Sequence, residues 1–391
     1  MIGESHAVPF EASAERLPQS DRVVPAFDYL EGLKSIRSEI LQAITRVLDS
    51  GRLILGPEVA AFESEFAHFV GCKHAIGVSS GTDALIVALR VLKIGPGHEV
   101  ITVANGPVPT IAAIRAVGAT PCLVDVDERS LQMDPRLVSQ AIHSATRCVL
   151  PLHLYGSPAP VAEIAEICRE HDIAIVEDCA QAHGTTIGCR HAGTIGDIGC
   201  FSFYPTKNLG AFGDAGMCIT DDPVLAARIR EVRCYGFRED RVAHVEGLNC
   251  RLDEMQAACL RVRLKSLRES LAKRSQISAD YLKQLEGLPF VLPMIPSYGK
   301  PSWHQFVIRV KHRDDWISWL ANQQIMVGIH YEHPVHLMPA YQQIAGRPKS
   351  LPVTEQACKE VLSLPMFPEL NQDDVAWVCR ALKSGVEAGL T

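Results

Sequence analysis

Short apolar runs alternate with amphipathic stretches over the first two thirds of the chain. Seven runs have the length and composition of strands: HAIGVS (74–79), EVITVA (99–104), PCLVDV (121–126), CVLPLH (148–153), IAIVED (173–178), GCFSFY (199–204) and GMCIT (216–220). Between several of them lie segments with helical spacing, such as TDALIVALRVL (82–92) and APVAEIAEICREHD (159–172). Near-continuous apolar strands separated by helices are typical of a parallel sheet covered on both faces. The pattern therefore predicts an α/β fold with a mainly parallel seven-stranded sheet.

The pattern changes after Asn249. Residues 251–287 form a long, charged segment with helical periodicity, followed by a strand-like FVIRV (306–310) and a helical DDWISWLANQQ (314–324). This order of elements is typical of a smaller α+β unit. We expect three parts along the chain: a polar N-terminal segment (1–22), a large domain (23–250) and a smaller C-terminal domain (251–391).

Composition and charge exclude several classes of protein. The chain has 391 residues, 47% of them apolar, and a net charge of −7. An acidic chain has no electrostatic reason to bind nucleic acid or an anionic membrane. No apolar run approaches the roughly 20 residues of a membrane span, and the N-terminus lacks the order of a signal peptide. The 13 cysteines include no CxxC pair. This usage fits a reducing compartment, so we expect a cytoplasmic protein.

Lys207 lies in the unusually apolar stretch CFSFYPTKNLGAFGDAG (200–216). A lysine in such surroundings can extend its ammonium group to water while its stem covers apolar neighbours. Alternatively, a desolvated lysine gives up its proton more readily and can form a Schiff base with an aldehyde. The stretch by itself leaves both interpretations open.

Asp178 ends the run IAIVED, and ligands of open α/β sheets bind beyond the carboxyl ends of the strands. An acid at this place can simply cap the next helix. It can also pair with a protonated ring nitrogen of pyridoxal phosphate (PLP), whose ring then accepts electrons. Asp178 and Lys207 both follow predicted strands, so we expect them at one edge of the sheet.

The segment GVSSGTDALIVAL (77–89) reads as a strand, a small polar turn and a helix. Free N–H groups at the start of a helix bind phosphate well. Without the GK[ST] ending of a nucleotide-binding loop, the segment does not favour ATP. The hydroxyl of Ser202 could add to the same phosphate site. The alternative is an ordinary capped turn between a strand and a helix.

Several motifs together resemble the sugar aminotransferases of the DegT/DnrJ type. These are PLP enzymes of the aspartate-aminotransferase fold (fold type I). The likeness runs from about Val24 to the C-terminus. The matching motifs are SGRLILGPEVAAFESEFA (50–67), VSSGTDAL (78–85), LHLYGSPA (152–159), VEDCAQAHG (176–184), FSFYPTKNLGAFGDAG (201–216), GLNCRLDEMQAA (247–258), HYEHPVH (330–336) and LSLPMFPEL (362–370).

The resemblance implies a role for each of the cofactor-binding residues. Lys207 would carry PLP through a Schiff base, Asp178 would pair with the pyridinium nitrogen, and Gln181 would lie by the phenolic oxygen. The phosphate would be bound by three residues: Gly81, Thr82 and Ser202. One position departs from the family, because Pro107 in ITVANGPVPT (101–110) stands where an aromatic side chain usually covers the ring.

The resemblance also implies a homodimer with shared active sites. Asn249 would reach the phosphate of the neighbouring subunit's cofactor, and Arg251 would lie near that site. His330 and His336 match positions near the sugar. A metal site in HYEHPVH is not expected, because Pro334 breaks any helix that would align its histidines. We interpret His183 as a hydrogen-bonded histidine of the site wall rather than as a base.

The predicted function is a PLP-dependent aminotransferase that moves an amino group from glutamate to a nucleotide-linked keto-sugar. The form FYPxKNLGAxGDxG around Lys207 resembles family members that act at carbon 3, so a 3-keto-6-deoxyhexose is the expected acceptor. Two alternatives remain. A PLP-dependent sugar dehydratase shares the fold, but these relatives generally replace the lysine with histidine. A non-catalytic regulator on the same fold is the other alternative.

Overall fold

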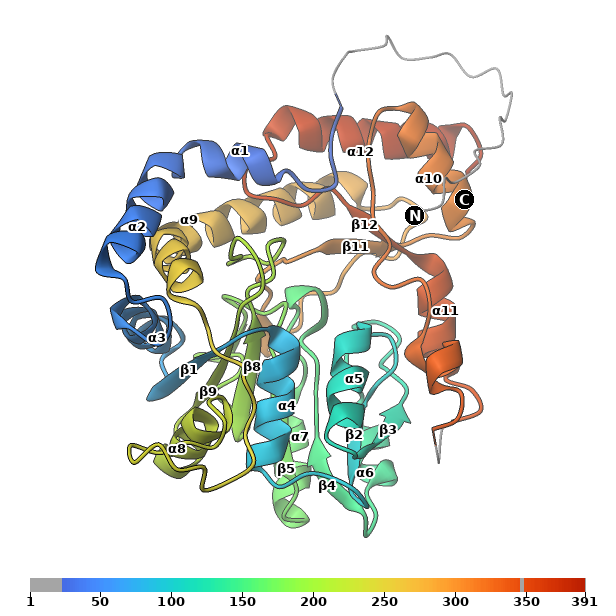
Figure 1. Ribbon diagram of the computed structural model, residues 1–391. Coiled ribbons are helices and arrows are strands. Elements are labelled where there is room, and N and C mark those ends of the chain that lie inside the picture. The colour runs from blue at the N-terminus through green and yellow to red at the C-terminus, as the bar shows by residue number, and fades with distance from the viewer. Residues whose placement is uncertain (1–22, 345–347, 391) are drawn as a thin grey trace.

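A seven-stranded sheet in the order β1-β9-β8-β5-β4-β2-β3 forms the centre of the computed structural model (Figure 1). The structure describes residues 23–344 and 348–390, so the predicted polar segment 1–22 lies outside the described residues. The strands are β1 (His74–Val78), β2 (Glu99–Val103), β3 (Thr120–Val124), β4 (Thr146–Val149), β5 (Ala174–Asp178), β8 (Ile198–Ser202) and β9 (Gly216–Thr220). Each strand overlaps one of the seven predicted runs.

The sheet is mainly parallel, as predicted. Strands β3, β2, β4, β5 and β8 pair in parallel, whereas β9 runs antiparallel to both β8 and β1. The run 148–153 is shorter than expected, since β4 ends at Val149. Pro151 has no N–H to continue the ladder, and the chain rejoins β5 only through the bridge between Leu152 and Asp178.

Helices cover both faces of the sheet (Figure 1). One face packs against α4 (Gly81–Val91), α5 (Val108–Ala116) and α8 (Pro223–Val232). The other face packs against four helices: α3 (Pro57–Val70), α6 (Pro135–Ala141), α7 (Val161–Glu170) and the first half of α9 (Glu254–Leu285). Because both faces are buried, the strands are apolar at nearly every position.

A second apolar core forms around the C-terminal half of α9. It contains the two-stranded sheet of β11 (Phe306–Arg309) and β12 (Val361–Leu364), with α10 (Arg313–Asn322) and α12 (Gln372–Glu387). Val24 also packs into this core, although it lies near the start of the chain. The predicted helices and strand of the C-terminal part are therefore present, and the exact division into domains stays a prediction.

The remaining elements are α1 (Tyr29–Lys34), α2 (Arg37–Ser50), α11 (Pro352–Glu360), β6 (Thr186–Ile187), β7 (Arg190–His191), β10 (Gly299–Lys300) and three short 3-10 helices (Leu154–Gly156, Val335–Leu337, Pro339–Tyr341). Helices α1 and α2 lie beside α9 (Figure 1). Among the described residues, no helix combines the length and the apolar character needed to cross a membrane.

Candidate active site

Asp178 and Lys207 lie close enough to interact, at the edge of the sheet where β5 and β8 end. Burial lowers the pKa of Lys207 to about 8, and the carboxylate of Asp178 opposes that shift. Asp178 is 2% exposed, and burial raises its pKa, while hydrogen bonds and the Lys207 ammonium counteract the rise. The pair is thus a lysine that can lose its proton near neutral pH and a buried carboxylate.

The carboxylate of Asp178 is held by one donor at each oxygen. The hydroxyl of Thr110, in the first turn of α5, donates to Oδ2 over 2.8 Å. The backbone N–H of Ala180 donates to Oδ1 over 3.1 Å. Sequence reasoning did not single out Thr110, although it ends the stretch ITVANGPVPT in which Pro107 departs from the family. Two donors fix the plane of the carboxylate at the strand end.

The start of α4 comes into direct contact with the end of β8. Ser80 is the N-cap of α4, and its hydroxyl accepts the N–H of Asp83 over 3.0 Å. A Cβ added at Gly81 would lie 2.5 Å from Cβ of Ser202. Only a glycine lets the first N–H groups of the helix approach this strand end so closely. The start of α4 therefore lies directly against Ser202, and the binding of a phosphate there stays a prediction.

Gln181 is held in place by two tyrosines. Its Oε1 accepts the backbone N–H of Tyr155 over 2.5 Å, and its Nε2 donates to the hydroxyl of Tyr331 over 3.0 Å. The hydroxyl of Tyr155 in turn donates to the carbonyl of His330. Burial raises the pKa of Tyr331 to about 12, so its hydroxyl keeps its proton at neutral pH. The amide of Gln181 consequently has a fixed orientation beside Asp178.

Three imidazoles stand around Lys207, all with a lowered pKa. Burial is the main cause, and the positive charge of Lys207 adds to it for His183, His304 and His330. The pKa of His330 falls to about 4, and its Nδ1 lies 2.8 Å from the hydroxyl of Ser363. All three imidazoles are neutral at pH 7, so Lys207 is the positively charged group among these four side chains.

His183 lies in an aromatic part of the core. Its ring packs against Phe66, Phe201 and Phe203. Neither ring nitrogen has a hydrogen-bond partner of good geometry within the described residues, although the Ser202 backbone lies near enough to oppose the lowered pKa. Aromatic residues of the core thus surround the ring, and the interpretation of His183 as a hydrogen-bonded histidine of the site wall stays a prediction.

Asn208, next to Lys207, joins this loop to the segment before β11. Its Nδ2 donates to the carbonyl of Ser302 over 3.1 Å, and its Oδ1 lies 3.2 Å from Nδ1 of His304. Because an amide oxygen only accepts, Nδ1 of His304 carries the ring proton. Asn208 thus fixes the tautomer of His304. Neither residue was singled out by the sequence analysis.

The comparisons with known proteins agree with this geometry. The DegT/DnrJ/EryC1/StrS aminotransferase family matches the chain over residues 34–383. The chain belongs to this family. A curated relative from Streptomyces venezuelae, dTDP-3-amino-3,4,6-trideoxy-alpha-D-glucose transaminase, is 45% identical over 365 residues, which cover 93% of this chain and 96% of the relative.

Solved structures give the same result. DesV from S. venezuelae, in complex with a ketimine intermediate, has a TM-score of 0.91 at 45% identity, covering 93% of this chain and 99% of that one. NtdA from Bacillus subtilis, with the cofactor PMP bound, has a TM-score of 0.87 at 30% identity, covering 94% of this chain and 87% of that one. The protein is a PLP-dependent aminotransferase of fold type I.

Three predicted site residues of the aminotransferase remain: Asn249, Arg251 and His336. Asn249 is exposed, and the guanidinium of Arg251 lies 5.5 Å from the ring centre of Tyr235. His336 is fully buried, with Nε2 3.1 Å from Oε1 of Glu355. This contact lies at α11, and the place of His336 near the sugar stays a prediction.

One buried group of possible metal ligands occurs in the described part of the aminotransferase: His153, Glu177 and Cys179, whose ligand atoms lie within 4.8 Å of one another. The carboxylate of Glu177 already has four neighbours. Nε2 of His153 lies 3.0 Å away, and three backbone N–H groups donate to it, from Gly193, Ile195 and Gly196. These bonds anchor the loop before β8, and the absence of a metal stays a prediction.

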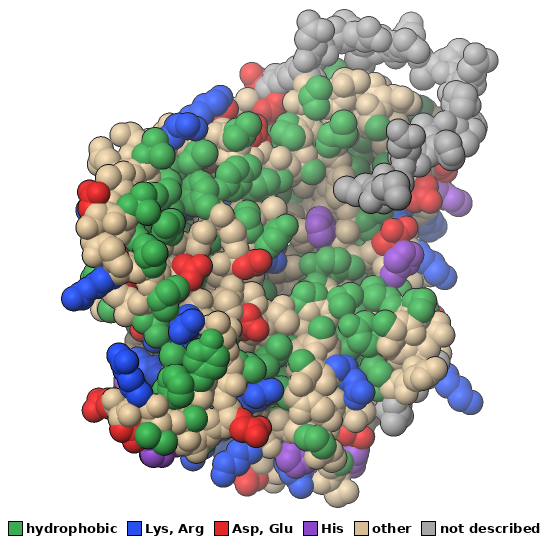
Figure 2. All heavy atoms as spheres, viewed as in Figure 1, with side chains coloured by type: hydrophobic (Ala, Val, Ile, Leu, Met, Phe, Trp, Pro, Cys, Tyr) green, Lys and Arg blue, Asp and Glu red, His purple; other side chains and the backbone are tan. Residues whose placement is uncertain are grey.

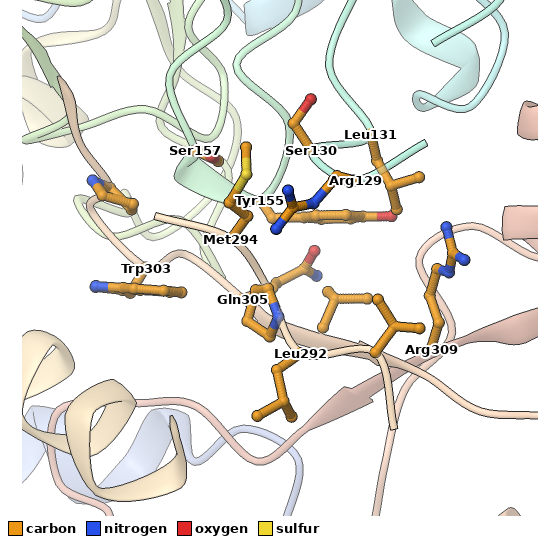
Figure 3. Close-up of a pocket in the computed structure, with 14 residues that line it drawn as sticks. Arg129, Ser130, Leu131, Tyr155, Ser157, Leu292, Met294, Trp303, Gln305 and Arg309 are labelled. Atoms are coloured by element: carbon orange, nitrogen blue, oxygen red, sulfur yellow. The ribbon is translucent and has the colours of Figure 1, made fainter. Parts of the chain in front are cut away.

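A depression on the surface of the aminotransferase lies around Tyr155 (Figure 3). Figure 3 shows Arg129 and Met294 beside the tyrosine ring, and Trp303 and Gln305, from the segment before β11, also line the depression. None of the predicted site residues lines it. Tyr155 thus lies between this depression and Gln181, whose Oε1 accepts the backbone N–H of Tyr155.

Proposed function

We propose that this aminotransferase transfers the amino group of glutamate to carbon 3 of a nucleotide-linked 3-keto-6-deoxyhexose. The observation that carries the proposal is the pair of Lys207, with its lowered pKa, and Asp178, held by Thr110, at one sheet edge. The name of the S. venezuelae relative, whose product carries its nitrogen on carbon 3 of a dTDP-sugar, supports the acceptor. The FYPTKNLGAFGDAG form around Lys207 supports the same position.

PLP, when bound, supplies an aldehyde that takes up amino groups and a ring that accepts electrons. Lys207 would hold the cofactor through its Nζ. Once the amino substrate has replaced it on the cofactor, the freed amine, whose pKa is lowered to about 8, would take a proton from the substrate carbon and return it. Asp178 would keep the ring nitrogen protonated, because its carboxylate is buried and fixed by two donors. Gly81, Thr82 and Ser202 would bind the phosphate.

Gln181 and His330 would shape the space around the reacting groups. The second proton on Nε2 of Gln181 remains available, because the first is donated to Tyr331. We propose that it donates to the phenolic oxygen of the cofactor. His330 stays neutral at its pKa of about 4 and would contact the sugar without adding charge.

The dehydratase alternative is disfavoured by Lys207, and no observed contact favours a regulator.

We propose a homodimer whose active sites are shared. Asn249 is exposed, and Glu254 ties its segment to the start of α3 by accepting the N–H groups of Gly56, Glu58 and Val59 over 2.8–2.9 Å. Large apolar side chains near both segments are exposed: Leu53, Ile54, Leu55, Tyr235 and Phe237. Figure 2 shows hydrophobic side chains gathered over the face that carries α2 and α9. A second copy would cover such a surface.

We also propose a cytoplasmic location, because all 13 cysteines are free, as expected in a reducing compartment.

The test of the function is an amination screen with glutamate and nucleotide-linked 3-keto and 4-keto sugars. Mass spectrometry and NMR of the product should place nitrogen on carbon 3. Nitrogen on carbon 4, with 3-keto sugars left unchanged, would contradict the assigned position.

A further inference from the structure

The loop that carries Lys207 is closed by bonds of its own backbone. The N–H of Ala211 donates to the carbonyl of Phe203 over 2.7 Å, and the N–H of Lys207 donates to the carbonyl of Tyr204 over 2.8 Å. Asn208, the next residue, instead makes two side-chain hydrogen bonds to a segment outside the loop. The place of Lys207 therefore depends on what Asn208 contacts.

Asn208 contacts residues 302–305, here called the strap, which come directly before β11. Its Nδ2 donates to the carbonyl of Ser302 over 3.1 Å, and its Oδ1 accepts the ring N–H of His304 over 3.2 Å. Two bonds to one amide group fix both its distance and its orientation. Trp303, between the two contacts, packs in the C-terminal core. Asn208 thus fastens the Lys207 loop to that core.

The strap also braces the loops that follow β4 and β5. The N–H of Ser302 donates to the carbonyl of Gly156 over 2.9 Å, and Oγ1 of Thr185 lies 2.9 Å from Oγ of Ser302. Gly156 has a φ of +81°, and a Cβ added there would lie 2.5 Å from Oγ of Ser302 and 3.0 Å from the carbonyl oxygen of Gln181. Only a glycine permits this approach. One short segment therefore contacts the loops of both Lys207 and Gln181.

We propose that Asn208 and His304 are positioning residues for Lys207. They set the place of its amine relative to Gln181, because the strap holds both loops. The inference rests on the proposed role of Lys207 as the residue that carries the cofactor and moves the proton. Misplacement of such a group by about 1 Å can slow a reaction roughly a hundred-fold. Asn208 and His304 act on the reaction through Lys207.

The test is a pH titration of the Schiff-base absorbance in the PLP-loaded protein. Asn208→Ala should move the midpoint by about 0.5 unit or more, because the charged Schiff base changes its place among its neighbours. The rate at which saturating glutamate removes this absorbance should fall roughly ten-fold or more. Asn322→Ala is the matched control and should change neither quantity, because Asn322 is exposed at the end of α10.

Two substitutions of His304 separate the hydrogen bond from packing. The amide nitrogen of His304→Asn takes the place of Nδ1 and can still donate to Asn208, whereas His304→Leu fills the space without a donor. His304→Asn should keep the wild-type midpoint, and His304→Leu should match Asn208→Ala. Combining His304→Leu with Asn208→Ala should add no further shift, because both remove the same contact. The two His304 variants decide the matter if Asn208→Ala fails to fold.

Wild-type midpoints and rates in both Asn208→Ala and His304→Leu, at a wild-type melting temperature, would overturn the proposal. So would equal shifts in His304→Asn and His304→Leu, which would assign His304 to packing alone. Failure of the proposed function gives different results. A Schiff base on another lysine after borohydride reduction would refute the role of Lys207 itself. Wild-type absorbance that glutamate leaves unchanged would refute the proposed donor, while the titration still tests the contact.

Discussion

The hydroxyl of Thr110 donates a hydrogen bond of 2.8 Å to Oδ2 of Asp178, across 68 positions of sequence. Thr110 is 3% exposed, so this contact is shielded from water. It joins α5, the helix that begins after Pro107, to the strand end that carries the proposed partner of the cofactor ring. We therefore propose that Thr110 is a positioning residue, which would act on the cofactor through Asp178.

Thr110→Val should weaken PLP binding, because Oδ2 of Asp178 loses its donor. A hydrogen bond to a charged group contributes about 1.5–3 kcal/mol, so the Kd for PLP should rise roughly ten-fold or more. Thr110→Ser keeps the hydroxyl and should restore most of the affinity. Fluorescence titration of the cofactor-free protein with PLP measures the effect. Equal affinities for the Val and Ser variants would refute the positioning role.

Asp178→Asn tests the carboxylate itself. The amide has nearly the same shape, so the variant should retain some cofactor, but an amide cannot stabilise the charged ring nitrogen. Turnover should therefore fall by at least two orders of magnitude, about 2.7 kcal/mol or more of lost transition-state stabilisation. Steady-state kinetics at saturating PLP measures the loss. A rate near that of the wild type would show that the ring does not depend on this acid.

The lowered pKa of Lys207 predicts how stability depends on pH in the cofactor-free protein. The folded protein releases this proton at about pH 8, and the unfolded chain releases it near 10.5. Between these values the unfolded chain binds more protons, so the free energy of unfolding rises with pH. The contribution is on the order of 3 kcal/mol over the whole window.

Urea denaturation of the wild type and of Lys207→Met, at several pH values from 7 to 10.5, isolates this contribution, because the other groups cancel in the difference. The wild type should gain stability relative to the variant as the pH rises above 8. Parallel stability curves would mean that Lys207 keeps an ordinary pKa in the folded protein.

Asn249 tests whether two subunits share each site. Mixed dimers of Lys207→Ala and Asn249→Ala protomers contain one site with both wild-type residues, if Asn249 acts on the partner's cofactor. Mixing two inactive or weakened variants should then restore up to half of the wild-type activity per dimer. Native mass spectrometry confirms that mixed dimers form. Activity that stays at the sum of the parent variants would argue that each site is built from one chain.

The fold could be predicted from the sequence because apolar runs mark buried strands directly. The pattern also places Asp178 and Lys207 at strand ends, where parallel strands bring side chains together. It does not show that β9 runs antiparallel, since a buried strand is apolar in either direction. Contacts such as Thr110 with Asp178 were also out of reach, because periodicity does not tell which residue of a covering helix meets which strand end.

The same limit applies to His183 and His304. Both are buried histidines, and their neighbours in the sequence do not show what surrounds each ring. The structure separates them, since Asn208 fixes the tautomer of His304, whereas the ring of His183 lies among phenylalanines. The burial of His336 and its contact with Glu355 depend on α11, more than ten residues away along the chain, so the motif around His336 does not show them.

The central claim is that Lys207 carries the cofactor, and borohydride reduction tests it most directly. Reduction of the PLP-loaded protein converts a Schiff base into a stable bond, and peptide mass spectrometry then locates the modified lysine. The account predicts the phosphopyridoxyl group on Lys207, with Lys207→Ala left unlabelled and without the Schiff-base absorbance. A label on another lysine of the wild-type protein, or equal labelling of the variant, would contradict it.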